Sequence, residues 1–126
     1  IWVAGVAPVK MFGGGSQSRG FTYVYDIARG TIAAIRDVGY EIINLGGGRN
    51  PVSLNTIISK LEELLGVKAK IDHKPFHIAD LMETWADISK AKRLLDWEPL
   101  VSLEDGLEKS VQWYMDNRHW LKEVKV

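Results

Sequence analysis

The spacing of apolar residues predicts one helix with particular clarity, over residues 54–65. Ser53 is well placed to cap its first turn, and Gly66 can supply the left-handed residue that ends it. The apolar positions repeat at three- and four-residue intervals, which places them on one face. They are Leu54, Ile57, Ile58, Leu61, Leu64 and Leu65. We expect this face to pack against the rest of the domain.

Three weaker helical patterns accompany it. Residues 1–8 are in addition consistent with the last turn of a further helix. Asp26, Asp87 and Ser102 are candidate caps, the last with Asp105 in a sequence resembling a capping box. The apolar faces predicted for these helices are Ile27, Ala28, Thr31, Ile32 and Ile35; Ile88, Ala91, Leu94 and Leu95; and Leu103, Leu107, Val111 and Tyr114. Pro99 separates the last two helices.

Short runs of apolar, β-branched or aromatic residues predict strands at 9–12, 21–24, 41–45 and 68–72. The run 41–45 has the length of a buried strand, whereas 68–72 alternates like a half-exposed one. Triple glycines at 13–15 and 46–48 end two of these runs. Residues 73–86 show no regular pattern. The sequence thus predicts an α/β fold with short strands and about four helices.

Length and charge restrict the possible functions. The 126 residues match one small domain, and the pattern shows no boundary within residues 1–126. Sixteen basic and sixteen acidic residues cancel, so we expect no nucleic acid or membrane partner. The chain has no cysteine and no apolar run long enough to span a bilayer, which is consistent with a cytoplasmic protein.

Three clusters are candidates for chemistry. The glycines at 46–48 before a helix resemble a phosphate loop, but neither the dinucleotide nor the P-loop spacing is present, and a tight turn is the simpler interpretation. His73, His77 and Asp80 could bind zinc only on a helix, which Pro75 argues against. Arg19 follows a glycine loop and is either a phosphate clamp or an ordinary exposed arginine.

Several ordered phrases resemble one enzyme family. Residues 12–30, FGGGSQSRGFTYVYDIARG, resemble the phrase FGDGSQSRDFTYVDDIARG of extended short-chain dehydrogenase/reductase enzymes that act on NDP-sugars. The segments 40–48 and 51–58 resemble a late strand of that fold and its following helix. The segment TWADISKA at 84–91, followed by LLDWEP at 94–99, resembles the family's ending. The resemblance covers essentially the whole chain and is strongest to the UDP-glucose and UDP-glucuronate 4-epimerases.

The resemblance implies a fold and a set of binding residues. The chain would be the C-terminal part of a doubly wound NAD(P)-binding fold together with the small substrate-binding subdomain. Arg19 would bind the diphosphate of a UDP-sugar, and His77 and Asp80 would take the places of the family's Arg-x-x-Asp pair. Nucleotide-pocket residues would complete the site. These are Phe21, Asn50, Val52 and Ser53.

The resemblance also identifies what the sequence does not contain. No glycine fingerprint for NAD opens the chain, and no tyrosine is followed four residues later by lysine. We therefore predict no catalytic, cofactor-binding or metal residues in this chain, which would be a fragment that binds a UDP-sugar without converting it. Gly14, Gly20 and Tyr25 stand where the family phrase has aspartates, and Asp96 replaces a glycine.

Two alternatives remain. The chain is a non-enzymatic module derived from an epimerase, in which an unpaired strand at 41–45 favours a homodimer or larger oligomer. Alternatively, a separate NAD-binding chain completes the enzyme.

Overall fold

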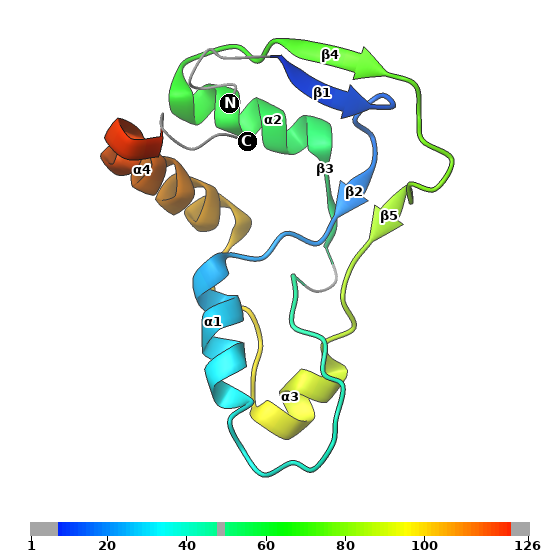
Figure 1. The fold of residues 1–126 in the computed structure, drawn as a ribbon, viewed down its shortest axis with the longest axis vertical. Helices are drawn as coiled ribbons and strands as arrows, with labels where there is room; N and C mark the ends of the chain where they lie inside the picture. The colour runs from blue at the N-terminus through cyan, green and yellow to red at the C-terminus, as the bar shows by residue number, and fades with distance from the viewer. Residues whose placement is uncertain (1–7, 48–49, 122–126) are drawn as a thin grey trace.

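The computed structural model describes residues 8–47 and 50–121. Figure 1 shows an elongated arrangement with elements at both ends of the long axis. Strands β1 (Val9–Phe12) and β4 (Ile71–Lys74) lie at one end with helix α2 (Leu54–Leu65), while α1 (Val24–Ala33) and α3 (Ser89–Leu95) lie at the other. Helix α4 (Leu103–Leu121) packs against α2. The predicted α/β class, with about four helices and short strands, is confirmed for the described part of the chain.

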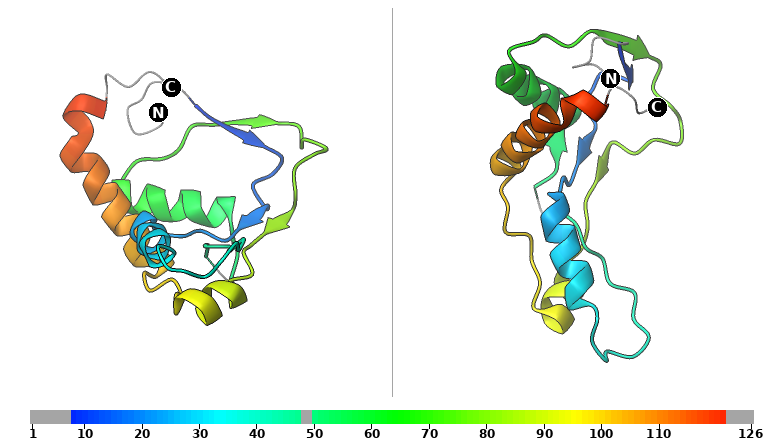
Figure 2. Two further views of the ribbon diagram at one scale, coloured as in Figure 1. Left: turned by 60° about the horizontal axis from the view of Figure 1, so that its bottom comes forward. Right: turned by 60° about the vertical axis from the view of Figure 1, so that its left-hand side comes forward.

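Two small sheets connect these elements. Strands β1 and β4 pair in parallel over their four residues. The second sheet has the order β3-β2-β5, from β3 (Val52–Ser53), β2 (Ser18–Arg19) and β5 (Glu83–Thr84). Strand β2 runs antiparallel to β3 and parallel to β5. Three distant parts of the sequence therefore meet in this sheet, as the right-hand view of Figure 2 also shows.

Helix α2 confirms the prediction made from its local signals. The Ser53 hydroxyl accepts the Thr56 N–H at 3.1 Å, and Gly66 has a φ of 64° at the C-cap. Ile57 is buried on the predicted face, whereas Leu64 is 40% exposed. At the end of α3, Asp96 has a φ of 53°, a left-handed conformation that suits the glycine it replaces in the family phrase. An aspartate costs on the order of 1 kcal/mol more than glycine in this conformation.

Several local predictions are wrong. The run 41–45 is not a strand: Ile43 and Leu45 pack against the core, but Ile42 is 73% exposed. Residues 21–23 are irregular, and α1 begins at Val24 with Tyr23, not Asp26, at its N-cap. In both segments apolar composition indicated a strand, but a strand also requires a neighbour that accepts its backbone hydrogen bonds.

Other boundaries are displaced. The strand predicted at 68–72 lies at 71–74, and the segment predicted as irregular contains β5. Asp87 precedes the N-cap of α3 by one residue, although its carboxylate accepts the Ser89 N–H at 2.9 Å. Most of the predicted apolar face of α1 is exposed, including Ile32 and Ile35, because Asp26 and Gly30 occupy the buried side. The helical turn predicted near residues 1–8 lies largely outside the described residues.

The buried core lies where α1 and α3 meet. It consists of Ala91, Leu95 and Trp97, with Ala33, Ile43, Leu45, Ile88 and Leu94 packed around them. Gly30 permits the close approach, since a Cβ there would lie 2.7 Å from Trp97 Nε1. Among the described helices, none combines the length and apolar character needed to cross a bilayer.

Candidate functional site: a cluster around Arg19

The sheet β3-β2-β5 positions Arg19 beside Asp80, 61 residues away in sequence. Arg19 Nη2 lies 2.6 Å from Asp80 Oδ1, and the two side chains are 27% and 32% exposed. Arg19 Nη1 donates to the carbonyl oxygens of Ser18 and Leu81, both at 2.9 Å. Three contacts thus fix the guanidinium while it remains accessible. The remaining N–H groups make no hydrogen bond to the described residues.

Asp80 is also held by hydrogen bonds to the backbone of neighbouring residues. Its Oδ1 atom accepts the Leu81 N–H at 2.9 Å, and its N–H donates to the His77 carbonyl oxygen at 2.9 Å. His77 is exposed, and its Nδ1 accepts the Ala79 N–H at 3.2 Å. Phe12, His77, Ala79 and Asp80 surround an open depression of about 370 Å³. The predicted pair of residues 77 and 80 therefore lies in one turn beside Arg19.

A second depression, of about 310 Å³, adjoins Asp80 and is mainly apolar. Phe21, Gln17 and residues of β1 and α2 line it. Gln17 is 1% exposed, and its Nε2 donates to the Phe12 carbonyl oxygen. Gly13, with a φ of 76°, allows this packing, because a Cβ there would lie 3.0 Å from Gln17 Nε2. Sequence analysis did not select Gln17, although it is the amide within the motif SQSR.

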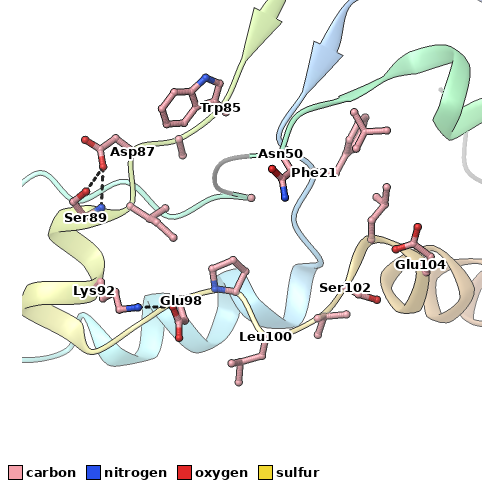
Figure 3. Close-up of a pocket in the computed structure, with 17 residues that line it drawn as sticks. Phe21, Asn50, Trp85, Asp87, Ser89, Lys92, Glu98, Leu100, Ser102 and Glu104 are labelled. Atoms are coloured by element: carbon pink, nitrogen blue, oxygen red, sulfur yellow. Dashed lines mark hydrogen bonds and ion pairs between the residues drawn. The ribbon is translucent and has the colours of Figure 1, made fainter.

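Two further predicted residues, Asn50 and Val52, line a larger depression of about 840 Å³ that Phe21 also borders. Figure 3 shows Trp85 and Asp87 across from Glu98 and Leu100, with Phe21 and Asn50 between the strands and α4. Val52 also lines this depression. A hydrogen bond from Lys92 Nζ at 2.8 Å and the charge of Lys92 hold the pKa of Glu98 below its ordinary value. The depression therefore carries paired charges.

The seven predicted residues are thus divided among neighbouring surfaces. Arg19, His77 and Asp80 belong to one cluster, Asn50 and Val52 face the larger depression, and Phe21 lies between them. The Ser53 hydroxyl is occupied by capping α2. Its backbone, however, pairs with Ser18 in the register that also places Val52 opposite Arg19.

Gly20 explains one departure from the family phrase. A Cβ at this position would lie 2.2 Å from the Gly47 carbonyl oxygen, and a Cβ on Gly47 would lie 2.0 Å from the Phe21 carbonyl oxygen. Aspartate cannot occupy position 20 in this fold without moving the backbone. Gly14, by contrast, has open space where its side chain would be.

The arrangement does not indicate a metal centre. Within 8–47 and 50–121, no group of three or more histidine, cysteine, aspartate or glutamate side chains is placed to hold a metal ion. His73 is at the end of β4 with its Nδ1 3.5 Å from the Gly13 carbonyl oxygen, whereas His77 and Asp80 lie in the following turn. The chemistry available here is the binding of an anion by a positioned guanidinium.

Known proteins share sequence with this chain. Residues 3–46 match the profile of the NAD dependent epimerase/dehydratase family. A UDP-glucuronate 4-epimerase from Thermodesulfobacterium geofontis is 56% identical over 99% of this chain, which spans 39% of that protein. The chain is homologous to part of an NAD-dependent epimerase/dehydratase. The proposed resemblance to 4-epimerases is confirmed to this extent.

Solved structures of epimerases share the fold. The Bacillus cereus UDP-glucuronic acid 4-epimerase in complex with UDP-glucuronic acid and NAD has a TM-score of 0.75 and 41% identity, over 86% of this chain and 35% of that one. The epimerase Mth375 from Methanothermobacter thermautotrophicus has a TM-score of 0.85 and 33% identity, over 97% of this chain and 37% of that one. The chain therefore corresponds to little more than a third of these relatives.

Proposed function

We propose that this chain is the C-terminal, nucleotide-sugar-binding part of an NDP-sugar epimerase/dehydratase. The ligand is a UDP-sugar, whose diphosphate binds Arg19 and whose nucleoside lies against Phe21 and the segment 50–53. The observation that carries the proposal is the Arg19–Asp80 pair, which the sheet assembles at 2.6 Å and leaves accessible. A positioned guanidinium beside an aromatic surface suits a nucleotide diphosphate. The Bacillus cereus relative was solved with UDP-glucuronic acid.

We further propose that the isolated chain binds without catalysing epimerisation. The sequence contains no Tyr-x-x-x-Lys pair and no glycine fingerprint for NAD. The hydride chemistry of such enzymes belongs to the bound nicotinamide. This chain would therefore contribute substrate binding and orientation to the complete enzyme.

Calorimetric titration of the 126-residue chain tests this proposal. UDP at concentrations up to about 1 mM is expected to bind, which corresponds to about 4 kcal/mol of binding free energy or more. NAD over the same range is expected to give no heat beyond dilution. Absence of UDP binding would contradict the proposed function, and binding of NAD would contradict the assignment of the cofactor site to another part of the enzyme.

A second function, association through an apolar face, is favoured by one observation. Helix α1 and the segment after it expose many large apolar side chains. Those more than 60% exposed are Val24, Tyr25, Ile32, Ile35, Tyr40 and Ile42. A surface of this kind ordinarily lies in an interface. We propose that it binds a second copy of the chain or, in the alternative, a separate NAD-binding chain.

Light scattering at micromolar concentration tests the self-association. The wild-type chain is expected to exceed its 14.2 kDa monomer mass, and Ile35→Asp is expected to reduce that mass because it places a charge on the face. Ile78→Asp is the matched control, since Ile78 is 97% exposed but lies outside this face. A wild-type monomer would refute the homo-oligomer and leave the separate partner as the alternative.

A further inference from the structure

Gln17 is a buried amide whose side chain lies between the end of β1 and Asp80. Its side chain is 1% exposed, and its backbone is fixed from both neighbouring elements: its carbonyl oxygen accepts the Leu54 N–H at 3.0 Å, and the next residue, Ser18, donates to the Met82 carbonyl oxygen at 2.8 Å. A polar side chain buried this deeply requires hydrogen-bond partners. Gln17 Oε1 accepts no hydrogen bond from the described residues. The hydrogen-bond partners of the side chain are therefore those of its amide nitrogen, Nε2.

The amide nitrogen has two acceptors, and they connect β1 to the anion cluster. Gln17 Nε2 donates to the Phe12 carbonyl oxygen at the end of β1 and to Asp80 Oδ2 at 3.5 Å. The other oxygen of the same carboxylate, Asp80 Oδ1, lies 2.6 Å from Arg19 Nη2. One donor therefore holds Oδ2 while the guanidinium holds Oδ1. This arrangement limits rotation of the carboxylate and hence the direction in which Arg19 is held.

We infer that Gln17 is a positioning residue for the diphosphate site, acting on Arg19 through Asp80. The inference rests on the proposed function, which assigns the diphosphate to Arg19. Gln17 makes no contact with the ligand in this proposal. One of its N–H groups is held by the Phe12 carbonyl oxygen and the other orients the Asp80 carboxylate. That carboxylate keeps the guanidinium in one orientation before the anion arrives. Preorganisation of this kind increases affinity by reducing the entropy lost on binding.

Two replacements of similar size test the donor. Gln17→Met removes both N–H groups without adding charge, and Gln17→Glu directs a carboxylate at Asp80 Oδ2. Each is expected to weaken UDP binding by about three- to tenfold, the net value of an ordinary hydrogen bond, because the contact with Asp80 Oδ2 is long and acts on the ligand through Arg19. The matched control is Gln112, whose Nε2 donates to Asp116 Oδ1 at 2.8 Å on the exposed surface of α4. Gln112→Met and Gln112→Glu are expected to leave the affinity within about twofold.

A second measurement does not require the ligand. Nitrogen-15 relaxation of Arg19 Nε in the free chain reports how tightly the guanidinium is held. Its order parameter is expected to fall in Gln17→Met and in Asp80→Asn. In the double variant the fall is expected to be less than the sum of the two single effects, because both replacements act through one carboxylate. A Gln17 that served only to stabilise the fold would lower the melting temperature without lowering the order of Arg19 selectively.

The outcomes separate this inference from the proposed function. If wild-type UDP binding is absent, the proposed function fails, and the Arg19 order parameter alone decides the role of Gln17. If UDP binds and the Gln17 variants bind it equally well, the positioning role is overturned while the proposed function stands. An unchanged Arg19 order parameter in folded Gln17→Met overturns the inference in either case.

Discussion

Replacing Asp26 with alanine is expected to destabilise the chain by about 3–5 kcal/mol, because two backbone N–H groups and Arg29 lose their buried acceptor. The Asp26 side chain is 1% exposed within α1. Its Oδ2 accepts the N–H groups of Leu100 and Val101 at 3.0 and 2.9 Å, and its Oδ1 lies 3.0 Å from Arg29 Nη2. A loss of this size is a large fraction of the stability of a small domain. Urea unfolding measures it.

The same carboxylate connects the core to the larger depression. The Asp26 backbone carbonyl accepts the Trp97 Nε1–H at 2.9 Å, and Leu100 and Val101 line the depression shown in Figure 3. Asp26→Asn keeps the shape of the side chain but turns N–H groups toward donors, so it is also expected to destabilise. Asp116→Asn, on the exposed surface of α4, is the control and is expected to change stability by less than about 0.5 kcal/mol. If Asp26→Asn and Asp116→Asn destabilised the chain equally, the structural role of the Asp26 carboxylate would be contradicted.

The pH dependence of stability gives an independent test of Asp26. Burial raises the pKa of its carboxyl, but the Val101 N–H, Arg29 and the Leu100 N–H outweigh burial, so the net pKa is lowered from 3.8. Because the folded pKa lies below the unfolded one, this stabilisation is present above about pH 4 and is lost as the pH falls through the folded pKa. The stability difference between wild type and Asp26→Asn is therefore expected to narrow below about pH 4. A stability difference that stayed constant with pH would refute the lowered pKa of Asp26.

Replacing Arg19 with alanine is expected to weaken UDP binding by about 10- to 100-fold, the range of a hydrogen bond to a charged group. The guanidinium is the cation that the β3-β2-β5 sheet places beside Asp80, and its removal also leaves that carboxylate facing the anion. Arg19→Lys is expected to recover only part of the affinity, since an ammonium cannot make the same planar contacts. Calorimetric titration with UDP measures both variants.

The control for Arg19 is Arg118→Ala, an exposed arginine on α4 that changes the net charge equally. It is expected to leave the UDP affinity within about twofold at 0.15 M salt, where distant surface charges are screened. If Arg19→Ala and Arg118→Ala weaken binding to the same extent, the effect is one of net charge and the diphosphate assignment to Arg19 is wrong.

The helices show how much the sequence predicted. Helix α2 was predicted at 54–65, because Ser53, the apolar stripe and Gly66 act over a few residues of chain. The left-handed conformation of Asp96 agrees with the glycine that the family phrase has at this position. Such signals are local, so the sequence contains them without knowledge of the rest of the fold. The order of family phrases was also readable, and the comparisons show homology to part of an NAD-dependent epimerase/dehydratase.

The strands and the site depended on contacts between distant segments. The sequence predicted a strand at 41–45, whereas the paired strand near the site is β2 at 18–19, which has partners on both sides. It named Arg19 and Asp80 separately, but their 2.6 Å contact follows from the register of β2 against β5. It assigned Asp26 to a helix cap, whereas the fold buries that carboxylate against Leu100 and Val101. Local sequence thus determined the helices and the resemblance to epimerases, while strand pairing and burial of polar groups were decided by tertiary structure, because their hydrogen-bond partners lie more than 30 residues away.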